Sequence, residues 1–152
     1  MTSAQVKNAY RRSETMGNIH PVKLIHLIYG RVITHLDLVV EAIDGGSTSK
    51  RGENLGRAIA LITELNASIR QEDESEAASF LRGLYTSILV ELPKIAISND
   101  RGIALQARKY IVRLMEIWEE TAMRENGLIE EPVLAKPVGQ TRLPQQGLSV
   151  SI

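Results

Sequence analysis

The sequence predicts an all-α protein, an antiparallel four-helix bundle, and three observations support this fold class. Valine, isoleucine and leucine recur mostly at three- and four-residue steps, the spacing of one helix face, instead of alternating with polar residues as in half-buried strands. Aromatic residues make up only 4% of the chain. The 152 residues, 43% of them hydrophobic, suffice for one domain with an ordinary core. Four amphipathic segments joined by short links then favour an antiparallel bundle.

The first strong helix is expected to begin at Pro21 and to reach about Ile43. Proline at the first helical position loses no hydrogen bond, and the stretch 44–47, Asp-Gly-Gly-Ser, predicts a stop and a loop. Residues 1–19 carry scattered apolar side chains among polar ones. We therefore expect 1–19 to be a short N-terminal cap segment that packs on the bundle of residues 20–126.

The second and third helices follow from apolar stripes. One stripe predicts a helix from about Ser49 to Ile69. The acidic stretch 71–76 predicts a turn and then a helix start, because carboxylates favour the N-terminal end of the helix dipole. The stripe assigned to the third helix consists of Ala77, Phe80, Leu81, Leu84, Tyr85, Ile88 and Leu92.

Pro93 is expected to end or kink the third helix, with residues 95–97 continuing as a displaced turn. The stretch 98–100, Ser-Asn-Asp, offers capping side chains for a fourth helix that reaches about Met123. After Asn126 the chain becomes rich in proline, glycine and glutamine. We expect residues 127–152 to form a largely disordered tail.

The composition argues against several classes of function. Lys+Arg and Asp+Glu both number 18, so no basic field favours nucleic acid, and cysteine is absent. No apolar run approaches the ~20 residues of a membrane span, which favours a soluble cytoplasmic protein. The three histidines, His20, His26 and His35, lack the spacing of metal ligands. We therefore expect no enzyme, no metal site and no cofactor.

The first helix is more apolar than a small core requires. Its apolar arc spans roughly 240°, whereas a core-facing helix typically needs an arc a little over ~100°. Either its sibling helices cover the whole arc, or part of it lines a groove for an amphipathic segment of a partner. The fourth helix gives a similar indication, since Leu105, Val112 and Met123 stand away from its main stripe.

Several pieces of the chain, in order, resemble the FliS family, the bacterial flagellar export chaperones of flagellin. The similarity covers about residues 6–121. Ala9-Tyr10 resembles the family's N-terminal Ala-Tyr, and "HPVKLIHLIYGRVITHL" resembles its Ser-Pro-started helix. "RGENLGRAIALITELNASI", "FLRGLYTSILVEL" with "SND", and "IVRLMEIWEET" resemble the later helices. His20 stands where the family has serine, so we expect that helix start to fray or to be capped by Asn18 instead.

The resemblance implies a chaperone that binds the disordered C-terminal region of flagellin, prevents premature polymerisation and serves the flagellar type III export apparatus. Tyr10 would cover part of the apolar surface in the free protein, or be a permanently docked aromatic residue. The expected contact residues are Tyr10, Leu24, Leu27, Ile28, Tyr29, Leu38, Leu105, Tyr110 and Val112.

Two alternatives stay open at this point. A bundle with surplus apolar surface could form a constitutive homodimer that serves as a scaffold or adaptor, and the chaperone itself could be a monomer or a weak homodimer. A histidine phosphotransfer domain would use His26 or His35 as acceptor.

Overall fold

The computed structural model describes residues 19–129, and over this range the chain is helical and contains no strand. The predicted all-α class with four long helices is confirmed. The elements are α2 (Pro21–Asp44), α3 (Thr48–Ala67), α4 (Glu76–Glu91), the 3-10 turn η1 (Leu92–Lys94), α5 (Ile95–Ser98), α6 (Arg101–Trp118) and the π-helical turn η2 (Glu119–Met123). Residues 1–18 and 130–152 lie outside the described range, so the expected cap segment and tail stay predictions.

The chain divides into two units after Ile117. The first unit contains α2, α3, α4, α5 and all of α6 except its last residue, and it holds the bundle. The second unit begins at Trp118 and contains η2.

Helix α2 begins where the proline predicts, but its cap corrects the expectation for His20. The ring Nδ1 of His20 accepts a hydrogen bond from the Val22 amide at 3.1 Å. The imidazole therefore caps the start of α2, the role that a serine hydroxyl has at many helix starts. At the other end, Gly46 has a φ of 73°, a backbone conformation that glycine adopts without strain. Ser47 then caps α3, its Oγ accepting from the Lys50 amide at 3.3 Å.

Pro93 stops α4 without releasing the chain from the core. The helix ends at Glu91, and the proline lies in the following 3-10 turn. Leu92 and Ile95 on either side of it are fully buried, which anchors the short α5 as the predicted displaced turn. Asn99 adopts a left-handed conformation with φ 55°, and Asp100 Oδ1 accepts from the Gly102 amide at 2.8 Å to start α6.

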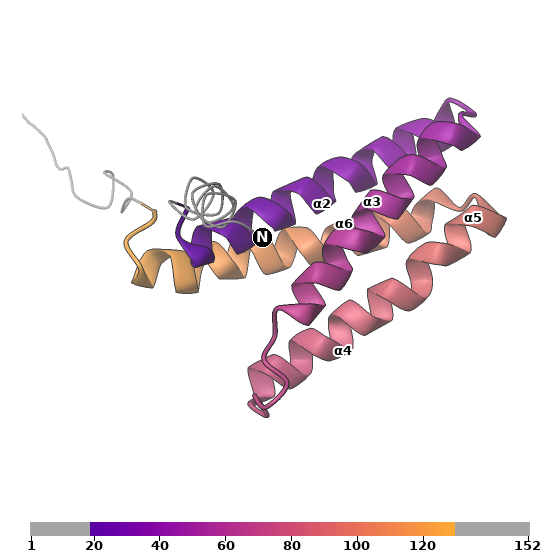
Figure 1. Cartoon of the computed structure of the whole chain (residues 1–152). Coiled ribbons are helices and arrows are strands. Elements are labelled where there is room, and N and C mark those ends of the chain that lie inside the picture. Colours follow the sequence, from indigo (N-terminus) through magenta and orange to yellow (C-terminus); the bar gives the residue numbers. More distant parts are fainter. Residues whose placement is uncertain (1–18, 130–152) are drawn as a thin grey trace, which may run out of the picture. The chain divides into compact units, whose positions relative to one another are not determined.

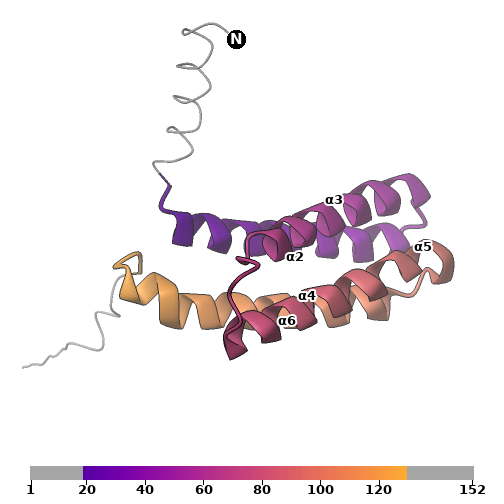
Figure 2. The ribbon, with the colours of Figure 1, turned by 60° about the horizontal axis from the view of Figure 1, so that its bottom comes forward.

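The core of the bundle receives side chains from all four long helices. In α2 the buried residues recur at three- and four-residue steps, as the apolar stripe predicts. Figures 1 and 2 show α2 and α3 side by side. Helix α6 is joined to α2 by Arg108 and Asp37, at 2.6 Å between Nε and Oδ1. The fully buried large side chains are Tyr29, Val32, Leu36, Val39, Ile62, Leu65, Leu92, Ile95 and Ile111.

The predicted core face of α4 was wrong in part. Ala77 and Phe80 are exposed, whereas Ala78, Tyr85 and Ile88 are buried. The helix is therefore rotated relative to the predicted stripe, and the Phe80 side chain near its start faces outward.

Candidate functional site

One edge of α2 carries three leucines that the bundle leaves partly uncovered. Leu24, Leu27 and Leu38 are 38%, 41% and 37% exposed. Steps of three and eleven residues place them along one side of the helix. Leu38 lines a groove of about 460 Å³ between α2 and α3, and Ile28, beside Leu27 in the sequence, is half-buried. We call Leu24, Leu27, Ile28 and Leu38 the α2 apolar edge.

Tyr29, which sequence reasoning places among the contact residues, lies in the core with only 2% of its surface exposed. Its hydroxyl is 2.6 Å from the hydroxyl of Tyr85, which ties α2 to α4. Burial raises the pKa of Tyr29 above the ordinary 10.0, with the Tyr85 hydrogen bond opposing the shift. Burial and then the neighbouring Tyr29 raise the pKa of Tyr85 as well. The pair joins two helices and offers no surface to a partner.

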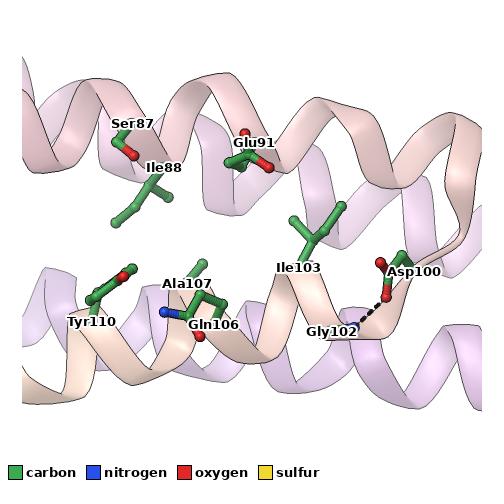
Figure 3. A pocket seen from close by; sticks show the side chains of 9 residues that line it. All are labelled: Ser87, Ile88, Glu91, Asp100, Gly102, Ile103, Gln106, Ala107 and Tyr110. Carbon is green, nitrogen blue, oxygen red and sulfur yellow. Dashed lines mark hydrogen bonds between the residues drawn. The ribbon is translucent and has the colours of Figure 1, made fainter.

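The predicted contact residues of α6 lie on two different edges of that helix. Tyr110 lines a second groove, of about 220 Å³, together with Ile103, Ala107 and Ile88 (Figure 3). This groove lies between α4 and α6. Leu105 and Val112 share the opposite edge with Arg108, the residue that pairs with Asp37 of α2. Leu105 and Tyr110 are exposed and Val112 is half-buried.

The structure thus distributes the predicted residues over separate surfaces. Leu24, Leu27, Ile28 and Leu38 come together on α2, Tyr110 faces the α4–α6 groove, and Tyr10 lies outside the described residues.

Sequence reasoning missed three strongly exposed apolar side chains: Phe80 is 62%, Val90 58% and Ile97 93% exposed. The angular position of Phe80 on α4 could have revealed the first of these three side chains. Ala78, Tyr85 and Leu92 are seven residues apart and buried, and Phe80 lies about 200° around the helix from Ala78.

Between residues 19 and 129 no group of three or more histidine, aspartate or glutamate side chains could hold a metal ion. Nδ1 of His35 is 2.9 Å from Oδ1 of Asn54, a helix-to-helix contact. No helix within this range is long and apolar enough to span a bilayer.

A helical bundle with exposed apolar edges is typical of proteins that bind other proteins. The family model described as flagellar protein FliS matches residues 2–125, and the chain belongs to this FliS family. FliS proteins are chaperones rather than enzymes, so the prediction of a non-enzymatic protein is confirmed. The chain is also similar to the flagellar secretion chaperone FliS of Bacillus subtilis (strain 168). The two are 22% identical over 122 residues, which cover 79% of this chain and 90% of the relative.

Proposed function

We propose that the protein is a cytoplasmic export chaperone that binds the disordered C-terminal region of flagellin. In this role it prevents flagellin from polymerising before export and supports secretion by the flagellar type III apparatus. Membership of the FliS family and similarity to a flagellar secretion chaperone support the proposal. The observation that carries it is the α2 apolar edge, which keeps leucine side chains in contact with water on a folded bundle.

The proposed mode of binding is an amphipathic segment that folds as it lies on this edge. A disordered client loses conformational entropy on ordering, so a large apolar contact must offset that loss. Burial of about 1,000 Å² of apolar surface contributes roughly 25 kcal/mol at ~25 cal/mol per Å², before ordering and association costs of similar size. Micromolar or tighter affinity is therefore attainable without ion pairs, and we expect it to depend little on salt.

Leu24, Leu27, Ile28 and Leu38 are the proposed primary contacts. Leu105, Val112 and Tyr110 are proposed as secondary contacts. Tyr10 is proposed as a cover of this surface in the free chaperone. Tyr29 is left out of the contact set, because its side chain is buried.

The proposal is tested by calorimetric titration of a flagellin C-terminal peptide into the full chain and into a Leu27→Gln/Leu38→Gln variant. We expect the native chain to bind with a strongly negative heat-capacity change, the signature of apolar burial. The double variant should bind at least tenfold more weakly.

Ile97→Gln is the matched control, since it removes an even more exposed apolar side chain from α5, a helix that contributes no residue to the α2 apolar edge. It should leave the affinity unchanged. A peptide that does not bind, or that binds the double variant and the native chain equally, would contradict the proposal.

A further inference from the structure

A positively charged residue lies in the middle of the α2 apolar edge. Arg31 is exposed, and it lies seven residues after Leu24 and seven residues before Leu38. Seven residues make almost two helical turns, so these three side chains lie within about 40° of one another around α2. At 1.5 Å per residue, Arg31 is about 10 Å along the helix axis from each leucine. A helical segment that lies along the edge therefore passes over this arginine.

Arg31 has no hydrogen-bonded or ion-paired partner within residues 19–129, which sets it apart from the arginines on the other helices. Asp37, the first carboxylate of α2, is already paired with Arg108. The hydrogen-bonded or ion-paired arginines of the described range are Arg51, Arg57, Arg70, Arg82, Arg101, Arg108 and Arg113.

The neighbours of Arg31 on α2 explain why it is unpaired. Side chains three and four residues away lie on the same side of a helix, and none of these four positions holds a carboxylate. They are Leu27, Ile28, Thr34 and His35. The Thr34 hydroxyl donates to the carbonyl of Gly30 at 3.1 Å, and the His35 ring is 2.9 Å from the side-chain oxygen of Asn54. The guanidinium of Arg31 therefore depends on water or on another molecule for its acceptors.

A guanidinium that is covered by an apolar surface loses its hydration, which is costly unless another acceptor replaces the water. The aliphatic part of the Arg31 side chain can lie along the neighbouring leucines without this cost. A bound helix with an apolar side chain opposite Arg31 would leave the charge unpaired. A carboxylate in the same place would accept a charge-assisted hydrogen bond. The arginine therefore discriminates between segments that have the same apolar stripe.

We propose that Arg31 selects the client segment by binding one of its aspartate or glutamate side chains. This acidic residue is flanked, about seven residues away on either side, by apolar residues that contact Leu24 and Leu38. The inference rests on the proposed function, because the occupant of the edge is the flagellin C-terminal segment. It adds the chemistry of that segment and its register, since a single polar position in an apolar seam fixes how two helices align.

The test is a double-mutant cycle between Arg31 and the client. Each aspartate and glutamate of a flagellin C-terminal peptide is replaced in turn by its amide, and every peptide is titrated calorimetrically into the full chain and into Arg31→Met. Methionine keeps an apolar side chain and removes the charge. The variant should bind the unmodified peptide at least threefold more weakly. One amide peptide should show the same loss with the native chain and no further loss with Arg31→Met.

Arg70→Met is the matched control, because it removes the same charge from a side chain that is 80% exposed and lies outside the α2 apolar edge. It should leave the affinity for every peptide unchanged. Arg31→Met should melt within a few degrees of the native chain, since it breaks no contact between described residues. Reversal of the charge gives a gain of function: Arg31→Glu should prefer the peptide that carries lysine at the identified position over the unmodified peptide.

Three results would overturn this inference while the proposed function stands. One is equal affinity of the native chain and Arg31→Met for the peptide, and another is a loss that no single carboxylate of the peptide shares. The third is coupling within the chain, in which Arg31→Met and Glu14→Gln lower the melting temperature of the free protein non-additively. A peptide that binds neither chain would instead overturn the proposed function, and this inference with it.

Discussion

At the scale of single residues, the pairing of Tyr29 with Tyr85 connects two helices of the bundle through their side chains. Two hydroxyl groups 2.6 Å apart in an otherwise apolar interior satisfy each other across α2 and α4. The burial of a polar group is tolerated when it has such a partner and is costly when the partner is removed. The two residues therefore act as a unit, although they lie 56 positions apart in the chain.

Substitution of Tyr29 by phenylalanine should destabilise the fold by about 1–3 kcal/mol, because it removes the partner of a buried Tyr85 hydroxyl. Addition of Tyr85→Phe to that variant should cost little more, or should restore part of the loss, since the isolated hydroxyl then disappears. Urea unfolding of the single and double variants measures both effects. Equal and additive losses would show that the two hydroxyls act independently.

The same pair predicts how the unfolding free energy changes at alkaline pH. Both tyrosine pKa values are raised in the folded chain above the ordinary value of 10.0, which applies to the unfolded chain. The stability that the pair contributes is therefore fully present below pH 10. It is lost as the pH rises above that range, because the unfolded state releases its protons first. The fall in unfolding free energy between pH 8 and pH 11 should therefore be smaller for the double phenylalanine variant than for the native chain.

At the scale of elements, the start of α4 is fixed by a small set of polar contacts. Ser75 Oγ accepts from the Ala78 amide at 3.2 Å, and the Ser75 amide donates to Asp73 Oδ1 at 2.9 Å. The backbone hydrogen bond from Ser75 holds the pKa of Asp73 below its ordinary value. Arg82 donates to the carbonyl oxygens of Arg70 and Asp73, which fastens the α3–α4 link to the helix that follows it.

Replacement of Ser75 by alanine should cost about 0.5–2 kcal/mol, the usual loss for an N-cap side chain. Ser75→Asp should be close to neutral, because aspartate also caps. Thermal unfolding ranks the three chains. Hydrogen exchange should show faster exchange at the amide of Ala78 in the alanine variant. Unchanged exchange there would mean that the serine oxygen does not hold this end.

These elements show which parts of the fold could be predicted from the sequence. Pro21, the pair Gly45-Gly46 and Pro93 are local signals, because each acts through the backbone of its own neighbours, and all three mark real boundaries. The capping role of His20 was missed because it depends on how one ring nitrogen points.

The site was less predictable than the helices. An apolar stripe indicates which residues lie near an interior. It does not determine how the helix is rotated about its own axis within the bundle. Tyr29 and Phe80 show this limit: from the sequence, Tyr29 is expected to be a contact residue and Phe80 to be a core residue, whereas the structure buries the first and exposes the second. Whether such a residue is buried depends on how the other helices pack against its own helix, and a local sequence pattern does not predict that packing.

At the scale of the whole molecule, apolar burial rather than charge holds the bundle together. The ion pairs between described residues join side chains that are 40% to 80% exposed, including the α2–α6 pairs of Asp37 with Arg108 and Asp44 with Arg101. Exposed pairs contribute about 0–1 kcal/mol each. Apart from the Tyr29–Tyr85 hydroxyl pair, no polar or charged residue between 19 and 129 is buried.

The unfolding free energy of the chain should therefore change by no more than about 1 kcal/mol between 0.1 M and 1 M NaCl, a range over which the Debye length falls from about 10 Å to about 3 Å. An Ile62→Ala variant, which opens a gap at a fully buried position, should lose about 2–5 kcal/mol at either salt concentration. Denaturation with urea avoids the added ions of guanidinium. A loss of several kcal/mol in high salt would show that charge has a larger role than the exposure of these pairs indicates.

The joint between α5 and α6 has a practical consequence for labelling the protein. Asn99 adopts the left-handed conformation that closes α5, and its side-chain oxygen accepts from Arg51 of α3 at 2.8 Å. Arg51 also donates to the carbonyl of Ala96 at 3.3 Å. An inserted tag or reporter sequence would displace the bend and the acceptor together. This connection is therefore a poor insertion site, even though it is short, polar and on the surface.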